Sequence, residues 1–166
     1  MNQLPTSRAS SRASSRPLRV AIVAASWHRD IVSCATTAAR AELVRQGVPD
    51  DRIDLIEVPG AFEIPLHAQT LAKTAKYAAV VGCALVVDGG IYRHEFVTTA
   101  VIDGLMRVQL DTGLPVFSAV LTPHQFHEHA VHQQFFREHF VVKGTEVAQA
   151  CLATLASLER LGPLVD

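Results

Sequence analysis

Short apolar runs rich in β-branched residues alternate along the chain with longer segments whose apolar positions recur at helical spacing. A continuous apolar run bounded by polar or glycine-containing segments is typical of a strand that is buried on both faces of a sheet. Four such runs predict strands at residues 19–25, 53–58, 78–87 and 115–121.

The segments between these runs predict helices. Ile31, Ala35 and Ala38 belong to one apolar stripe, and Gly47 is a natural stop for the helix that carries it. Pro65 falls in the first turn of the next segment, where a missing N–H costs little. The expected helices are residues 30–46, 62–74, 95–110, 124–139 and 145–161, with Lys143-Gly144 between the last two.

Strands that alternate with helices of this length indicate βαβ units and a parallel sheet covered on both faces. We therefore predict an α/β fold, a three-layer α/β/α sandwich around a four-stranded parallel sheet. In such sheets ligands bind beyond the carboxyl ends of the strands. The polar and aromatic residues that interrupt the apolar pattern gather at four such ends, residues 25–28, 58–63, 86–94 and 121–124.

The 166-residue chain is 49% hydrophobic and 19% charged, which suits one packed domain and excludes a disordered protein. Its 15 Lys and Arg against 16 Asp and Glu give a net charge of −1. Residues 1–19 hold four Arg and no acid, so the remainder has eleven bases against sixteen acids, a net charge of −5. An acidic globule offers no general basic surface, and we expect no nucleic-acid partner.

The first 17 residues contain the repeat SRASSRASSR. This composition predicts a disordered Ser/Arg-rich arm at residues 1–17, before a single domain at residues 18–161 and a short tail at residues 162–166. A transit peptide and an RNA-binding arm are the alternatives. A transit peptide is usually longer and has an amphipathic stripe, which this segment lacks. An RNA-binding arm would have aromatic residues among its arginines, and this segment has none.

No apolar run is long enough to span a bilayer, and the first 17 residues lack the apolar core of a secretory signal. The chain has an odd number of cysteines, and they are widely spaced: Cys34, Cys83 and Cys151. We interpret them as small buried hydrophobic residues in a reducing compartment, not as disulfide partners or zinc ligands. A cytoplasmic protein with no membrane partner is expected.

Trp27 is the single tryptophan and directly follows the first predicted strand. Tryptophan is often a core or interface residue, because its large apolar surface is buried on average. At the carboxyl end of a strand it can also be a stacking platform for a planar heterocycle, and its position favours this second interpretation.

Two loops at the strand ends have the composition of binding turns. In residues 58–63, Gly60 permits a tight turn and close ligand approach, and the N–H groups of the following helix point outward. Taken alone, this is also an ordinary turn with an acid at a helix start. Asp88-Gly89-Gly90 runs into a helix, as phosphate-binding loops do, although a plain loop is equally compatible.

Five of the eight histidines fall within sixteen residues, at His124, His127, His129, His132 and His139. Spacings of three residues invite a metal site, but there is no HExxH motif and no nearby cysteine. A solvated helix face and an anion contact by one histidine are the other interpretations. Lys143-Gly144 is compatible with a helix boundary or with a second anion contact.

The ordered blocks Ser26-Trp27, VPGAFEIP at 58–65, DGGIYRHEFV at 88–97, PVFSAVLT at 115–122 and Lys143-Gly144 together resemble the lumazine synthase family. The resemblance covers about residues 18–161. It implies a flavodoxin-like sandwich that assembles into pentamers, some of them paired into decamers or closed into larger shells. It also implies active sites between neighbouring subunits.

The resemblance implies the condensation of 5-amino-6-(D-ribitylamino)uracil with 3,4-dihydroxy-2-butanone 4-phosphate in riboflavin biosynthesis. The amine attacks the ketone to give an imine, phosphate leaves and the ring closes to 6,7-dimethyl-8-ribityllumazine, without cofactor or metal. The implied partners are the two small-molecule substrates and further copies of the chain, with riboflavin synthase a candidate downstream partner.

Family motifs also imply roles for particular residues. Trp27 stands where the family usually has Phe and would stack on the pyrimidine. Gly90 and Ile91 match the pair whose backbone receives the phosphate. The other implied contacts are Ala61, Phe62 and Glu63 at the ribityl chain, Leu85, Val86 and Val87 at the pyrimidine edge, and Ser118 near the ring.

Two departures set the chain apart from the usual family pattern. Arg93 occupies the position of the catalytic His, and His94 follows it, about 100° further around the helix. Arginine is a poor proton carrier but can hold phosphate and polarise the leaving group, so either residue is a candidate catalytic group. Ungapped counting from Ser118 places His132 at the phosphate-binding arginine, whereas Arg137 requires a gap.

We prefer His132 as the phosphate ligand and expect phosphate binding to weaken as the pH rises. The combined pattern resembles the divergent second type of the family in some bacteria, which tends to form decamers. A non-catalytic flavin- or lumazine-binding protein on the same scaffold is the alternative function, and an assembly scaffold is a third.

Overall fold

A computed structural model describes residues 18–91, 93–126 and 129–162, so the predicted arm, most of the predicted tail and His127 lie outside the described residues. Its strands form one parallel sheet in the order β2-β1-β3-β4. The strands are β1 (Val20–Ala25), β2 (Ile53–Val58), β3 (Ala79–Leu85) and β4 (Val116–Leu121).

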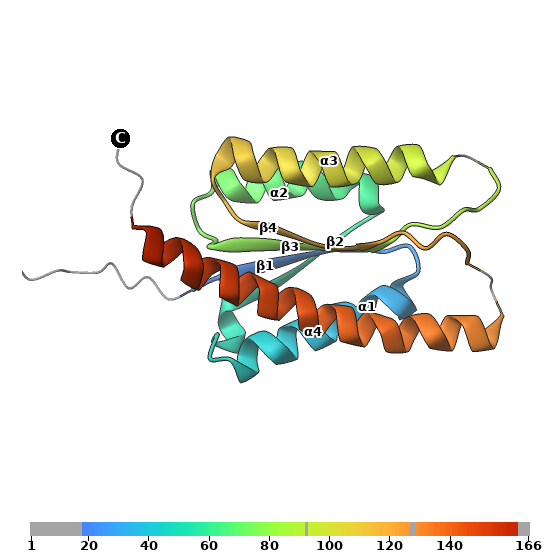
Figure 1. Ribbon diagram of the computed structural model, residues 1–166, viewed down its shortest axis with the longest axis horizontal. Coiled ribbons are helices and arrows are strands. Elements are labelled where there is room, and N and C mark those ends of the chain that lie inside the picture. The colour runs from blue at the N-terminus through green and yellow to red at the C-terminus, as the bar shows by residue number, and fades with distance from the viewer. Residues whose placement is uncertain (1–17, 92, 127–128, 163–166) are drawn as a thin grey trace, which may run out of the picture.

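Helices cover both faces of the sheet (Figure 1). On one face lie α1 (Arg29–Arg45) and α4 (Ala130–Leu161), and on the other lie α2 (Ile64–Lys73) and α3 (His94–Thr112). The short 3-10 turns η1 (Asp50–Arg52) and η2 (Ala61–Glu63) precede β2 and α2. The predicted α/β/α sandwich is confirmed, and its strand order is flavodoxin-like. In that order the connections change direction between β1 and β3, where α/β proteins bind their ligands.

The central strand β1 explains why the apolar pattern is continuous and does not alternate. All six of its residues are buried, because β2 and β3 pair with its two edges and helices cover both of its faces. Val20, Ile22 and Ala24 pack in the core beneath α1 and α4, and the alternate residues pack beneath α2 and α3. The two cores are therefore separated only by the sheet.

Helix α4 is one continuous helix, so the predicted break at Lys143-Gly144 is wrong. A Cβ atom on Gly144 would lie 2.2 Å from the backbone oxygen of Ala35 in α1. The glycine therefore allows two helix backbones to approach closely and does not end a helix. Lys143 donates to Glu146 on the same helix, 2.7 Å away. The helix also begins later than predicted, at Ala130.

All three cysteines are free. Cys83 and Cys151 are buried, and burial raises the pKa of each thiol to about 12, so both stay protonated. Cys34 is only half-buried. Within the described residues no helix is long and apolar enough to cross a membrane.

Glu42 is a charged side chain in the contact between α1 and α4, only 7% exposed. Its carboxylate accepts hydrogen bonds from Arg45, Gln46 and, across the helix pair, Gln149. The bonds from Arg45 contribute most to lowering the pKa of Glu42 from 4.5 to about 2. The carboxylate is thus ionised at neutral pH and ties the two helices together.

We expect Gly144→Ala to destabilise the fold, because the added methyl group meets the Ala35 carbonyl and neither backbone can yield without moving its helix. The expected loss is about 3 kcal/mol, more than the ~1 kcal/mol that alanine gains in helix propensity. Urea denaturation measures it. Ser157→Ala, at an exposed position of α4, is the matched control. Equal midpoints for the two variants would show that the helices are not in close contact at Gly144.

We expect Glu42→Gln to lower stability at neutral pH and to matter less in acid. Because the pKa of Glu42 is depressed, its interactions stabilise the fold above about pH 4.5 and are lost as the pH falls toward 2. Denaturation midpoints of wild type and variant should differ most at about pH 7 and converge only as the pH falls to about 2. A difference that is independent of pH would contradict the assigned charge interaction.

Candidate active site

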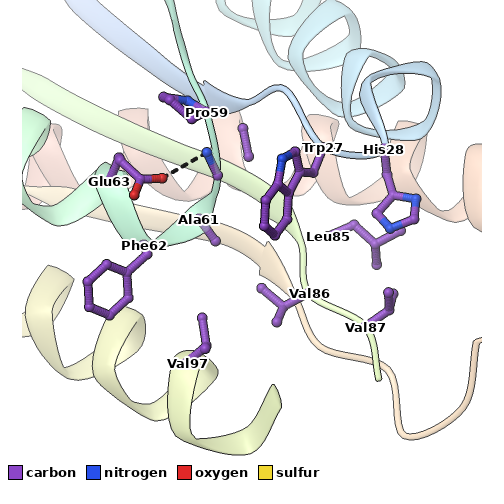
Figure 2. A pocket seen from close by; sticks show the side chains of 12 residues that line it. Trp27, His28, Pro59, Ala61, Phe62, Glu63, Leu85, Val86, Val87 and Val97 are labelled. Carbon is purple, nitrogen blue, oxygen red and sulfur yellow. Dashed lines mark hydrogen bonds between the residues drawn. The ribbon is translucent and has the colours of Figure 1, made fainter. Parts of the chain in front are cut away.

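A cavity of about 300 Å³ lies at the carboxyl ends of the three strands β1, β2 and β3 (Figure 2). It sits beside the β1–β3 switch point that the strand order identifies. Its lining consists of Ala25, Trp27 and His28 after β1, Pro59, Gly60, Ala61, Phe62 and Glu63 after β2, Leu85, Val86 and Val87 at the end of β3, and Val97 of α3.

The turn from β1 into α1 places Trp27 over this cavity. Ser26 N–H still donates to the Val58 carbonyl, 2.8 Å away, and α1 begins only three residues later. The reversal is completed by His28, whose φ of 55° and ψ of 39° are left-handed. Trp27 remains 63% exposed, and its indole stands between Phe62 and Glu63 on one side and Leu85 on the other (Figure 2). Its interpretation as a core residue is therefore wrong.

The turn after β2 is closed by a reciprocal cap. Gly60 N–H donates to Glu63 Oε2 at 2.8 Å, and Glu63 N–H reaches back to the Gly60 carbonyl at 3.4 Å. Gly60 has an extended backbone with φ −144°, so a strained turn is not the reason for glycine here. A Cβ atom would lie 3.2 Å from Glu63 Oε2 and 4.0 Å from the Trp27 ring. Glycine therefore lets the capped turn lie close against the tryptophan.

Among the described residues of the loop after β3, only Val86 and Val87 contribute to the lining of the cavity. Gly90, in a left-handed conformation with φ 72°, donates its N–H to Asp88 Oδ1 at 2.8 Å. Ile91 is 91% exposed. The N–H that family motifs assign to the phosphate is thus bonded to a carboxylate in this structure, and neither Gly90 nor Ile91 lines the cavity.

The start of α3 lies at the rim of the cavity. Arg93 precedes the helix and holds its guanidinium 4.8 Å from the centroid of the Phe96 ring. His94 is 12% exposed, with Nδ1 3.7 Å from Glu95 Oε2. Neither residue lines the cavity, but Val97 does, and it lies three residues after His94 on the same side of the helix.

Three other candidate residues lie outside the cavity lining. Ser118 is exposed in β4, where its Oγ accepts from Val120 N–H at 3.2 Å. His132 lies in the first turn of α4, with its ring centroid 6.0 Å from that of Phe126. Arg137 pairs with Asp30 of α1.

Among the residues that the structure describes, no group of three or more His, Cys, Asp and Glu side chains could hold a metal ion. Seven predicted site residues do come together in one cavity. They are Trp27, Ala61, Phe62, Glu63, Leu85, Val86 and Val87.

The chain matches, over residues 17–159, the family model described as 6,7-dimethyl-8-ribityllumazine synthase. It belongs to the lumazine synthase family. A 6,7-dimethyl-8-ribityllumazine synthase from Rhodococcus erythropolis is 62% identical over 86% of this chain and 92% of that protein. Proteins named 6,7-dimethyl-8-ribityllumazine synthase 2 are also similar. The one from Bradyrhizobium diazoefficiens is 60% identical over 88% of this chain and 87% of its own length. The one from Pseudomonas syringae pv. tomato is 55% identical over 86% of this chain and 84% of its own length.

The resemblance to the lumazine synthase family and to its second type is thereby confirmed. His28, Pro59 and Val97 line the cavity although the family motifs implied no role for them. The available signal for His28 was its place beside Trp27, at the end of a central strand. Val97 gave no signal, because its contribution depends on where α3 packs.

Trp27 should report ligand binding directly, because it is the only tryptophan and its face is open to the cavity. We expect riboflavin to quench the intrinsic fluorescence of the protein on binding. Trp27→Ala should weaken riboflavin affinity about tenfold, and Trp27→Phe should retain most of it, because stacking on an aromatic contributes about 1–3 kcal/mol. Flavin fluorescence titration measures the variants. Phe135→Ala, at an exposed position of α4, is the control, and equal losses in both alanine variants would refute stacking at Trp27.

Proposed function

We propose that this chain catalyses the condensation of 5-amino-6-(D-ribitylamino)uracil with 3,4-dihydroxy-2-butanone 4-phosphate. The products are 6,7-dimethyl-8-ribityllumazine, phosphate and water. The observation that carries the proposal is the open face of Trp27 beside the capped turn at Gly60 and Glu63, in a cavity whose other walls, His28 apart, are apolar. A planar ring that bears a polyol chain matches this arrangement.

The ring stacks on Trp27 above Leu85, Val86 and Val87, and the ribityl chain runs toward Ala61, Phe62 and Glu63. Glu63 uses Oε2 to cap the turn, and a carboxylate can accept further hydrogen bonds, here from ribityl hydroxyls. Ser118 is the remaining residue assigned to this substrate. Holding the two reactants in register supplies most of the rate enhancement, because it converts a bimolecular reaction into an effectively unimolecular one.

The butanone phosphate binds at the rim, where Gly90, Ile91 and His132 hold its phosphate. The phosphate takes the Gly90 N–H in place of the Asp88 carboxylate, an exchange of one anion for another. Arg93 and His94 act on the same group from the start of α3. Arg93 leaves its contact with the Phe96 ring to pair with the phosphate and favour its departure.

The working form is a homo-oligomer, a pentamer or a dimer of pentamers. Ile102, Met106 and Leu110 stand four residues apart on α3 and are all exposed, as expected of a surface that another copy covers. Sedimentation velocity distinguishes these assemblies from a monomer. The free cysteines favour the reducing cytoplasm, where riboflavin synthase would consume the product.

Non-catalytic binding of flavins or lumazines is the second candidate. It is favoured by Arg93 at the position of the family's catalytic histidine, because arginine does not release a proton near neutral pH. Riboflavin affinity without turnover would establish it.

The test is to mix the purified protein with both substrates and follow lumazine absorbance. Turnover above the uncatalysed rate is expected, and no excess would refute the proposal. Arg93→Ala should raise KM for the butanone phosphate about tenfold or more while changing KM for the amine little, because a charged hydrogen bond to phosphate is lost. If kcat falls in His94→Ala and KM stays unchanged in Arg93→Ala, His94 and not Arg93 is the important group at the start of α3.

A further inference from the structure

Helix α3 carries a buried hydroxyl group that the fold leaves without a partner. Among the residues that the structure describes, Thr98 Oγ1 is the only buried side-chain oxygen or nitrogen that makes no hydrogen bond. A buried hydroxyl that is left unpaired lowers the stability of the fold, because it has given up its bonds to water. Such a group in a native protein therefore calls for a physical explanation.

Three other helical threonines satisfy their hydroxyls with their own backbone. Thr70, Thr112 and Thr145 each donate to the carbonyl four residues earlier, at 2.9, 2.7 and 3.1 Å respectively. For Thr98 the corresponding acceptor is the His94 carbonyl, and that bond is not formed. The Thr98 hydroxyl is thus turned away from the acceptor that helical threonines ordinarily use.

A partner from outside the chain does not reach this hydroxyl as the fold stands. The oxygen is buried within a single copy of the chain, so a substrate or a residue of another copy touches it only by displacing the atoms that cover it. Thr98 also does not line the cavity. A partner for the hydroxyl is therefore expected within the same chain.

The His94 imidazole is the neighbouring polar group with bonding capacity to spare. His94 lies one turn before Thr98 on the same side of α3, and helical side chains point back toward the N-terminus, so the hydroxyl lies over the turn of His94. The imidazole is only 12% exposed, and its Nδ1 is 3.7 Å from Glu95 Oε2, too far for a hydrogen bond. Both groups lie at the rim of the cavity, beside the lining residue Val97.

We propose that Thr98 is a positioning residue whose hydroxyl oxygen accepts a hydrogen bond from the His94 imidazole when the butanone phosphate is bound. The inference rests on the proposed function, in which His94 acts at the phosphate end. Cβ atoms four residues apart on a helix are about 5–6 Å apart, so a rotation of the imidazole from Glu95 toward Thr98 forms the bond.

This bond fixes both the orientation and the tautomer of the imidazole. A neutral imidazole has one N–H and one nitrogen that accepts, and the hydrogen bond made by one nitrogen sets the role of the other. Thr98 holds the N–H of one ring nitrogen and thereby directs the other nitrogen of His94 toward the substrate.

The decisive variant is Thr98→Val, which keeps the branched shape of the side chain and removes the hydroxyl. We expect kcat to fall about three- to tenfold, as for one lost hydrogen bond, while KM for the amine substrate changes less than about twofold. Thr98→Ser retains the hydroxyl and should keep kcat within about twofold of wild type. In a His94→Ala background, Thr98→Val should lower kcat no further, because the group that it positions is absent.

Urea denaturation separates positioning from a structural role. Because the Thr98 hydroxyl has no partner in the free protein, Thr98→Val should leave the urea midpoint unchanged or raise it. Thr112→Val is the matched control on the same helix, since it removes a hydroxyl that donates to the Val108 carbonyl. The control should lower the midpoint and keep wild-type kcat.

Several outcomes would overturn the proposal. A kcat for Thr98→Val within about twofold of wild type, or an equal loss in Thr98→Ser, shows that the hydroxyl positions nothing. An unchanged kcat in His94→Ala, or equal fractional losses from Thr98→Val with and without His94, shows that it does not act through the imidazole. A lower urea midpoint in Thr98→Val assigns the hydroxyl a structural bond. If wild type makes no lumazine, the proposed function fails and this inference fails with it, whereas an active wild type matched by Thr98→Val overturns this inference alone.

Discussion

The pairing of β1 along both of its edges is the constraint on which the rest of the molecule depends. Residues Val20–Ala25 pair with β2, and Val20 to Ala24 also pair with β3, so the strand's backbone bonds within the sheet while every side chain is buried. A strand of this kind requires helices on both faces, because neither face can be left in water. A hydrogen bond from Ser26 N–H to the Val58 carbonyl extends the pairing with β2 by one residue. The chain then leaves the sheet and enters α1 within three residues.

That abrupt exit creates the cavity. An indole that follows a fully buried strand has no core left to enter, and the left-handed His28 turns the chain away while Trp27 stays exposed. The turn after β2 closes the other side, where Glu63 caps Gly60 and leaves space that a side chain would fill. Backbone geometry at the ends of β1 and β2 thus places the Trp27 ring, a stacking surface, beside the Glu63 carboxylate.

Sequence patterns predicted much of this and missed the rest for physical reasons. The continuous apolar runs gave all four strands, because burial on both faces leaves its mark in the residues themselves. The prediction of a helix boundary at Gly144 was wrong because the reason for the glycine, close contact with the Ala35 carbonyl of α1, lies far away in sequence. Strand-end residues such as Phe62 and Val86 came together as expected. The positions of Gly90 and Arg93 relative to the cavity depend on a loop conformation and a packed helix, which short motifs do not encode.

The charge distribution suits the separate placement of the two reactants in the proposed reaction. The cavity is apolar apart from Glu63 and His28 and therefore suits a neutral heterocycle with a polyol chain. The cations suited to a phosphate, Arg93 and Arg137, lie outside the lining, against Phe96 and Asp30 respectively. Residues 20–166 have a net charge of −5, and this placement of the two arginines would keep the phosphate of the proposed substrate at the rim.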